Sequence, residues 1–273
     1  MKILKKMNST SIIIPIHEFN DNISTYLNKA IESIINQQEV EKPDVLIVYS
    51  STIENEINNF IKEKYFNYNF KLIKNNGNTD YQSQVNLAVD SVNTDYFTVL
   101  EFDDELGLTY LKNINEYVKA YPNIDIFLIM MIEVTNENKG IKLTNEMVWS
   151  QQFVGENGEL GYLNLNSIKQ YTDFKLSGAA IKKSEFINLG RYKRNIKLTF
   201  MYEFILRALN NASKIFAIPK IGYRHLINRE GSLFDGYLKN MPMDERKFWF
   251  ETAFKESNFT TDREIDISKL QEK

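Results

Sequence analysis

The fold is decided by residues 96–105, which read YFTVLEFDDE. In this stretch a short apolar, β-prone run leads directly into acidic side chains: Glu101, Asp103, Asp104 and Glu105. A strand buried on both faces reads as such a continuous apolar run, and open α/β sheets bind ligands just beyond the carboxyl ends of their strands. Carboxylates this close repel one another, so the pattern favours a hard divalent cation carrying a phosphorylated ligand. A solvated acidic turn or an acidic helix N-terminus is the alternative.

Strand and helix patterns alternate upstream of this stretch. Buried-strand runs occupy residues 11–16, 45–49 and 70–73. Apolar residues at helical spacing alternate with them, predicting helices over 23–37, 53–61 and 81–92. We expect the first strand to stop at Pro15, which cannot donate to a β-ladder. The alternation predicts an α/β fold whose mostly parallel central sheet carries right-handed crossovers and helices on both faces.

The pattern downstream is less regular. A helix is predicted around 111–118, a full strand over 124–134, an irregular stretch over 136–173, a helix over 198–211 and a short strand over 215–218. We expect one domain over residues 1–235, with 9–105 and 106–235 as its halves, and a C-terminal helix and charged tail over 236–273. Long irregular stretches inside compact domains are usually functional or mobile. The aromatic residues of the stretch over 136–173, Trp149, Tyr162 and Tyr171, are candidates for stacking on an acceptor sugar or for packing.

The composition limits the function classes. A net charge of -3 argues against nucleic-acid binding, and the absence of cysteine excludes disulfides, thiol catalysis and cysteine-ligated zinc. No run reaches the about twenty apolar residues that a membrane span needs, and the start lacks the apolar run of a signal peptide. These features predict a cytoplasmic protein, and the richness in Asn, Ile and Lys is typical of an AT-rich bacterial or viral genome.

Five segments, in order, resemble motifs of the family 2 glycosyltransferases of the GT-A fold, across residues 9–235. They are Ser11–Glu18, Gly77 with Asn86, Leu100–Asp104, Ser177–Lys183, and Tyr223–His225 with Arg229–Ser232. The resemblance implies a Rossmann-like sheet and a nucleoside-diphosphate sugar as donor. It also implies a glycan or other hydroxyl as acceptor. The oligomeric state is left open.

The resemblance assigns roles to particular residues. Asp103 is the expected ligand of Mn²⁺ or Mg²⁺, assisted by Asp104, Glu101 and His225. The residues expected to bind the donor nucleotide are Pro15, His17, Glu18, Tyr49, Ser50, Asn86, Glu101, Arg224 and Arg229. An arginine can clamp a phosphate through its forked guanidinium, which suits Arg224 or Arg229.

Several positions depart from the family pattern. Glu101 replaces an Asp of the metal motif, Tyr49-Ser50 replaces the Asp after the second strand, and Val85 replaces an Arg. The acceptor-side Glu-Asp pair, which supplies the general base of an inverting displacement, is replaced by Phe200-Met201.

The nearest carboxylate to that pair is Glu203, one helical turn before Arg207, so it is the predicted base. An ion pair with Arg207 would explain Glu203 equally well. Asp173 and Glu185 are weaker candidates.

Three functions therefore remain open. The first is an inverting, metal-dependent glycosyltransferase. The second is an inactive relative that binds carbohydrate or nucleotide, which the missing Glu-Asp pair favours. The third is a nucleotidyltransferase, which normally has a Gly-rich, basic loop after the first strand; Pro15–Phe19 has neither feature.

Overall fold

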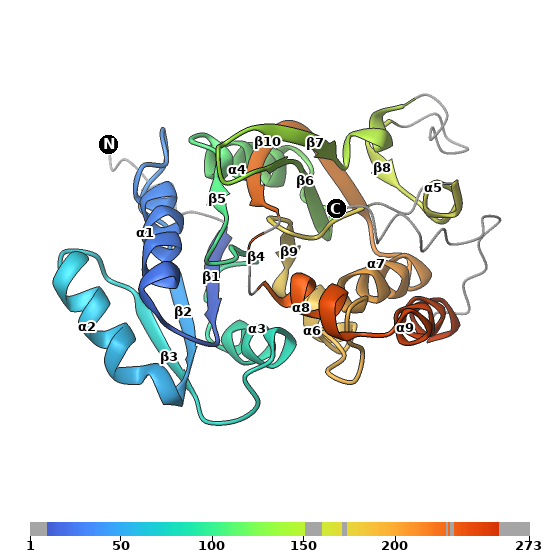
Figure 1. The fold of residues 1–273 in the computed structure, drawn as a ribbon. Coiled ribbons are helices and arrows are strands. Elements are labelled where there is room, and N and C mark those ends of the chain that lie inside the picture. Colours follow the sequence, from blue (N-terminus) through green and yellow to red (C-terminus); the bar gives the residue numbers. More distant parts are fainter. Residues whose placement is uncertain (1–9, 151–159, 171–173, 228, 230–231, 257–273) are drawn as a thin grey trace, which may run out of the picture.

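The structure is a computed structural model that describes residues 10–150, 160–170, 174–227, 229 and 232–256. Within these residues, ten strands form one sheet in the order β3-β2-β1-β4-β9-β6-β10-β5, with β7 paired to β6 and β8 paired to β10 (Figure 1). The strands are β1 (Thr10–Ile16), β2 (Val45–Ser50), β3 (Lys71–Asn75), β4 (Tyr96–Val99), β5 (Glu105–Leu106), β6 (Ile126–Val134), β7 (Gly140–Thr144), β8 (Tyr162–Leu163), β9 (Ala180–Lys182) and β10 (Ile215–Leu226).

The helices cover both faces of this sheet. The α-helices are α1 (Asp21–Ile35), α2 (Glu54–Lys64), α3 (Tyr81–Asp90), α4 (Tyr110–Ala120), α5 (Leu165–Gln170), α6 (Lys183–Asn188), α7 (Phe200–Asn210), α8 (Leu233–Asn240) and α9 (Met243–Glu256), with short 3-10 turns η1 (Ser51–Ile53) and η2 (Glu146–Trp149). Among the described residues, no helix is long and apolar enough to cross a membrane.

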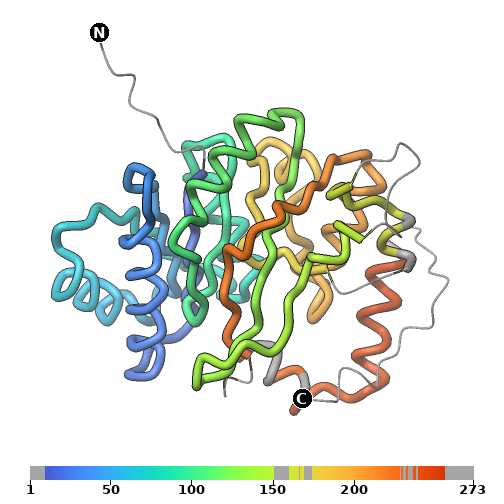
Figure 2. Tube along the Cα trace, turned by 90° about the horizontal axis from the view of Figure 1, so that it is seen from above, coloured from blue at the N-terminus to red at the C-terminus, as the bar shows by residue number. Residues whose placement is uncertain are grey.

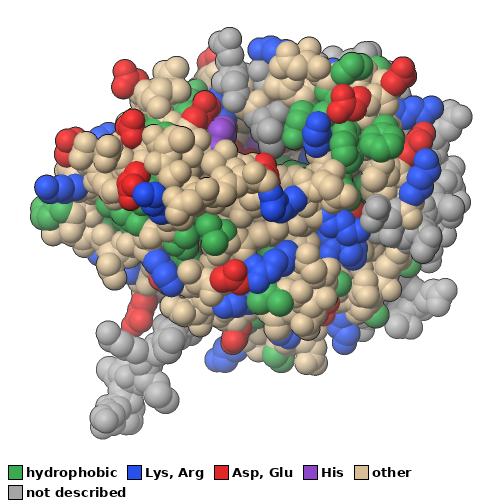
Figure 3. All heavy atoms as spheres, turned by 90° about the horizontal axis from the view of Figure 1, so that it is seen from below, with side chains coloured by type: hydrophobic (Ala, Val, Ile, Leu, Met, Phe, Trp, Pro, Cys, Tyr) green, Lys and Arg blue, Asp and Glu red, His purple; other side chains and the backbone are tan. Residues whose placement is uncertain are grey.

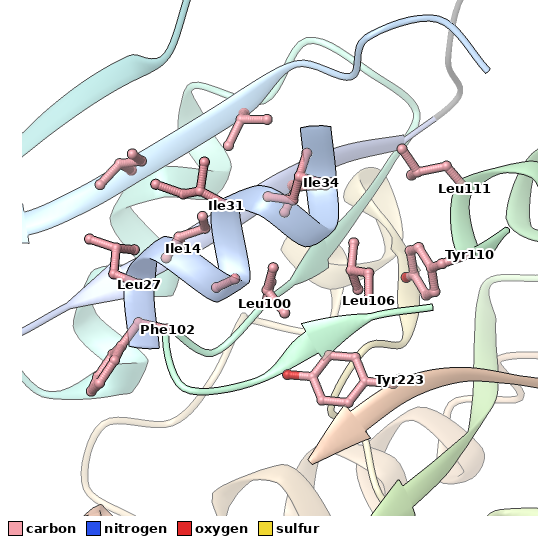
Figure 4. Packing of buried hydrophobic residues seen from close by; sticks show 14 of the residues in the cluster. Ile14, Leu27, Ile31, Ile34, Leu100, Phe102, Leu106, Tyr110, Leu111 and Tyr223 are labelled. Carbon is pink, nitrogen blue, oxygen red and sulfur yellow. The ribbon is translucent and has the colours of Figure 1, made fainter. Parts of the chain in front are cut away.

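Two hydrophobic clusters separate the layers. One joins the sheet to α1, α2 and α4, and the other joins the opposite face to α3, α6, α7 and α9. Figure 4 shows the first cluster, in which Leu27, Ile31 and Ile34 of α1 lie over Leu100 and Leu106. The two faces of β1, β2 and β4 are both covered, which explains why these strands read as continuous apolar runs. The predicted α/β fold is confirmed.

The strand directions place the carboxyl ends of the main strands at one edge. β1 pairs in parallel with β2 and β4, and β10 pairs in parallel with β6. The short strand β9 is antiparallel to both β4 and β6, so β4 and β6 run the same way. Segments that follow β1, β4 and β10 therefore meet on the same side of the molecule. Figure 2 shows the first strands and helices (blue) together on one side of the molecule and β10 (orange) running among the green segments in its middle.

Some predicted boundaries were wrong. The first strand continues through Pro15 to Ile16. The backbone nitrogen of Pro15 points toward β4, as the backbone of Ile13 does, and β4 has already ended at this level, so the missing N–H of Pro15 costs no bond of the β-ladder. The strand expected over 215–218 runs on to Leu226. The stretch over 136–173, expected to be irregular, contains β7, β8 and α5.

Candidate functional site

The acidic residues that follow β4 lie beside the carboxyl end of β10. Asp104 is 1% exposed, and its side chain is held by two groups of β10. The Nδ1 atom of His225 lies 3.0 and 3.2 Å from the two Asp104 oxygens, and the backbone N–H of Leu226 donates to one of them at 2.8 Å. Burial alone would lower the pKa of His225, but the negative charge of Asp104, followed by that of Glu101, raises it to about 9. His225 is thus held as a cation beside the acidic cluster.

Asp103 is paired with Arg229. The guanidinium Nε of Arg229 lies 2.5 Å from Asp103 Oδ2, and both side chains are about one-tenth exposed. The guanidinium also stacks over two rings, 5.0 Å from Phe102 and 5.8 Å from Tyr26. Burial and Asp104 nevertheless raise the pKa of Asp103. The site therefore carries more negative charge than Arg229 neutralises.

Glu101 faces the segment that precedes β9. Ser177 Oγ donates to Glu101 Oε1 at 3.0 Å, and the backbone N–H of Glu101 donates to the Tyr223 hydroxyl at 3.2 Å. Burial and the Asp104 carboxylate raise the pKa of Glu101 to about 7. A nearby positive charge would increase the fraction of Glu101 that is ionised at neutral pH.

The donor atoms of this cluster suit a hard divalent cation. Among the described residues, Glu101 Oε2 and Asp103 Oδ1 receive no hydrogen bond, so one carboxylate oxygen on each is available. Oxygen ligands of this kind are those that Mg²⁺ and Mn²⁺ prefer. No three His, Asp or Glu side chains in the described part of the chain are grouped as ligands of a single ion. The cluster thus offers a partial ligand set that water and phosphate oxygens would complete.

The end of β1 brings further predicted residues to this edge. The ring of His17 lies 6.0 Å from that of Phe102, and its Nε2 is 3.6 Å from Glu18. Burial lowers the pKa of His17. Viewed from below, the surface is hollowed next to a histidine side chain (Figure 3). Pro15 is buried within β1 just before this point.

The predicted residues of β2 are less accessible. Tyr49 is 4% exposed and packs in the hydrophobic cluster with α1 and α2. Ser50 caps the turn η1 by accepting from the backbone N–H of Thr52. The Tyr49 ring is therefore packed in the hydrophobic cluster and is not presented as a stacking surface.

Two predicted donor residues point elsewhere. Both ends of the Asn86 amide bind the backbone of Tyr192, at 2.9 and 3.1 Å, which ties α3 to the loop after α6. Arg224 alternates with its neighbours His225 and Tyr223 along β10, so it leaves the opposite face of the strand. Its guanidinium donates to Asn138 in the β6–β7 turn at 3.0 Å.

Glu203 does not have the surroundings of a general base. Its side chain has no exposed surface, and Arg207 Nε and Nη2 donate to its two oxygens at 2.8 and 2.9 Å. Lys193 Nζ lies 3.2 Å from the same carboxylate. A carboxylate held between two cations is poorly placed to take a proton from an acceptor hydroxyl, so these contacts favour the ion-pair role of Glu203 over the predicted role as general base.

The other candidates in the second half have packing roles. Glu185 accepts from Ser213 Oγ at 2.6 Å. Trp149 donates through its indole N–H to Ala217 O at 2.9 Å, and both Trp149 and Tyr162 pack edge-on against Phe216. Tyr171 and Asp173 lie outside the described residues.

Tyr81 is a residue of the site that the sequence interpretation missed. It is the first residue of α3, its ring lies 5.4 Å from that of Phe200, and its hydroxyl lies within the electrostatic influence of Glu101, Asp103 and Asp104. The sequence does contain a signal for this residue: Tyr81 is the first residue of a helix that follows a parallel strand, and the starts of such helices face the ligand-binding edge of the sheet.

Solved structures identify the class of fold. The structure of S. aureus TarS 1-349 in complex with UDP-GlcNAc matches with a TM-score of 0.64 and 16% identity, covering 96% of this chain and 78% of that chain. The mannosyltransferase PcManGT from Pyrobaculum calidifontis, in complex with GDP-Man and Mn2+, matches with a TM-score of 0.63 and 10% identity, covering 97% and 68%. The fold is that of the GT-A glycosyltransferases.

The sequence comparison then identifies the family. The family model described as "Glycosyl transferase family 2" matches residues 11–175, which is more than half of the chain. The protein belongs to glycosyl transferase family 2 and is a glycosyltransferase by class. No curated protein matches the sequence.

Proposed function

We propose that this protein transfers a sugar, with inversion, from a nucleoside-diphosphate donor to a hydroxyl group of a glycan or other acceptor, assisted by Mn²⁺ or Mg²⁺. The observation that carries the proposal is the buried acidic cluster at the end of β4. Burial, together with repulsion from Asp104, raises the pKa of Glu101 to about 7, and the carboxylates lie beside the cationic side chains Arg229 and His225.

The chemistry of sugar transfer explains this arrangement. The leaving diphosphate gains charge as the glycosidic bond breaks, so groups that are positive and already in place lower the barrier. A divalent cation held by Asp103 and Glu101 would supply such charge. Arg229, which stacks over Phe102, adds a forked hydrogen-bond donor that suits a phosphate group. Asp104 orients the ring of the cationic His225.

Two structural relatives support the choice of donor. TarS 1-349 was solved with UDP-GlcNAc, and PcManGT was solved with GDP-Man and Mn2+. Both ligands are nucleoside-diphosphate sugars. The base and the sugar that this chain selects are open to experiment.

The general base is the unexplained part of the proposal. The family's Glu-Asp position holds Phe200 and Met201, and Glu203 is sealed in an ion pair. These observations favour a second candidate function, a protein that binds a nucleotide sugar without transferring it.

The test is a panel of UDP- and GDP-sugars incubated with Mn²⁺, in which release of nucleoside diphosphate and binding by calorimetry are both measured. We expect metal-dependent release that Asp103→Ala reduces at least about a hundredfold, since metal-site electrostatics commonly contribute several kcal/mol. The matched control is Asp95→Ala, which removes an exposed carboxylate just before β4, at the opposite edge of the sheet.

The other outcomes decide between the alternatives. Binding without release would support the binding protein, and production of pyrophosphate would support a nucleotidyltransferase. Absence of both binding and release with every donor would refute the proposal.

A further inference from the structure

Tyr81 stands where the two halves of the site meet. It opens α3, directly after Asp80, whose carboxylate caps the helix by accepting from the Ser83 backbone N–H at 2.8 Å. The helix follows β3, which is parallel to β2, so its first turn lies at the same edge as the ends of β1 and β4. The cap fixes the backbone from which the Tyr81 side chain leaves.

The ring of Tyr81 is held by two aromatic rings from the second half of the chain. Its centroid lies 5.4 Å from that of Phe200 and 6.4 Å from that of Tyr192, and these two rings are 5.3 Å apart. Phe200 and Tyr192 are 5% and 3% exposed, whereas Tyr81 is half-buried. Phe200 occupies the position of the family's acceptor-side acid. Packing against two buried rings therefore orients Tyr81 next to the place where the base is missing.

The carboxylates of the acidic cluster act electrostatically on the hydroxyl of Tyr81. Burial, followed by the charge of Glu101 and with further contributions from Asp104 and Asp103, raises the pKa of Tyr81 well above its ordinary value. The hydroxyl is therefore neutral, and it belongs to the first turn of α3, at the edge of the sheet where β1 and β4 end. Within the described residues it forms no hydrogen bond, so it is able to donate one. A ring needed only for packing would serve equally well as phenylalanine, since the contacts to Phe200 and Tyr192 use the ring alone.

We propose that Tyr81 is a donor-binding residue whose hydroxyl donates a hydrogen bond to an oxygen of the sugar diphosphate at the acidic cluster. This inference depends on the proposed function, because the diphosphate is what brings an acceptor oxygen between the carboxylates and α3. The oxygen belongs either to the phosphate or to the sugar, and both are hydrogen-bond acceptors of the same kind.

The test is Tyr81→Phe, which keeps the ring and removes only the hydroxyl. Binding of UDP-GlcNAc, GDP-mannose and the corresponding free diphosphates is measured by calorimetry with Mn²⁺. We expect about tenfold weaker binding of the sugar nucleotide, the loss typical of one hydrogen bond to a charged or well-oriented acceptor. If binding of the free diphosphate is weakened equally, the partner of the hydroxyl is a phosphate oxygen. If only binding of the sugar nucleotide is weakened, the partner is a sugar oxygen.

The matched control is Tyr202→Phe. The Tyr202 hydroxyl is buried on α7 without a hydrogen-bond partner in the described structure, so its removal should leave donor binding unchanged. Equal affinities for wild type and Tyr81→Phe would overturn this inference and leave the proposed function standing. Failure of the wild type itself to bind any donor would overturn both.

A second measurement on the wild-type protein covers the case in which Tyr81→Phe does not fold. Tyr81 is partly exposed, so hydroxyl radicals, which oxidise the neutral ring, should label it in the free protein. We expect saturating donor and Mn²⁺ to protect Tyr81, as mapped by mass spectrometry, while exposed Tyr121 is oxidised equally in both states. Unchanged oxidation of Tyr81 under saturating donor would contradict the proposal.

Discussion

At the scale of single residues, the ion pair between Glu203 and Arg207 connects α7 to the loop that follows α6. Arg207 binds both Glu203 oxygens and also donates to the backbone carbonyls of Leu189 and Arg191. Asn86 holds the next residue of the same loop, Tyr192, from the other side. The pair thus fixes the loop whose aromatic residue supports Tyr81.

Replacing Glu203 with Gln tests this structural role. The change would remove the counter-charge of the buried Arg207 guanidinium and set an amide N–H₂ group in place of one of its acceptors, and breaking a buried ion pair costs about 3 kcal/mol. We expect the free energy of unfolding, measured with urea, to fall by about that amount, while metal-dependent donor binding per folded molecule stays the same.

The double variant Glu203→Leu/Arg207→Leu is the control, because it removes both buried charges and should recover part of the loss. If Glu203→Gln were instead fully stable but unable to transfer sugar, Glu203 would be the base after all.

At the scale of elements, the segment from Phe174 to Gly178 links the acidic cluster to the second half of the sheet. Asn145 binds the backbone of Lys175 through both ends of its amide, and Ser177 donates to Glu101. The Tyr110 hydroxyl donates to Gly178 O at 2.7 Å. These bonds hold this irregular segment against β6 and α4 although it forms no strand before β9.

Gly178 is the position in this segment that tolerates least change. Its φ is +69°, a conformation that disfavours side chains, and a Cβ atom would meet the ring of Tyr223. We expect Gly178→Ala to lower the free energy of unfolding by about 2 kcal/mol, the sum of backbone strain and overpacking. It should also weaken donor binding, because Tyr223 supports Glu101.

Gly236→Ala provides a matched control for the same substitution. Gly236 lies in α8 with open space around it, so alanine there should raise stability slightly. Urea denaturation of both variants measures the difference, and equal stabilities would contradict the account of Gly178.

The sequence predicted the elements up to β4 because each is a short apolar run with its own turn, and local patterning suffices there. It did not predict the full length of β10, because Pro219 reads as a strand end. In the structure, irregular pairing on both sides of Ile221 lets the strand resume and carry His225 to the acidic cluster. A bulge of this kind depends on the neighbouring strand β6, which the local pattern of 215–226 does not contain.

The candidate site also contains some residues that the sequence could predict and others that it could not. The acidic cluster and His225 could be predicted, because they lie at strand ends and carry distinctive side chains. The spacing of Glu203 and Arg207 predicted their ion pair but not their burial, which arises when α7 packs against the loop after α6. Tyr81 joins the site only through contact between the starts of α3 and α7, which are distant in the sequence.

At the scale of the whole molecule, the C-terminal helix α9 completes one of the two hydrophobic layers. Phe254 is 7% exposed, belongs to the cluster beneath α3, α6 and α7, and packs edge-on against Tyr202 at 5.6 Å. The hydroxyl of Thr199 donates to Trp249 O at 2.8 Å, which anchors α9 to the start of α7.

Two phenylalanines of α9, one buried and one exposed, test how much the packing of this helix contributes to stability. We expect Phe254→Ala to destabilise the protein by about 3 kcal/mol, because it removes a buried ring. Phe248 is 55% exposed, so Phe248→Ala should change stability by less than about 0.5 kcal/mol. Thermal denaturation of the two variants compares them, and similar melting temperatures would show that α9 contributes little to the layer.

The position of β10 in the chain bears on synthesis in the cell. β5 and β8 each pair with β10, and so does one side of β6, although all three precede it in the sequence. While the ribosome is still translating the intervening residues, these strands have unpaired edges that invite association with other nascent chains. The sheet can close only after Leu226 has left the exit tunnel. We therefore expect the yield of native protein from rapid overexpression to depend on chaperones that shield those edges.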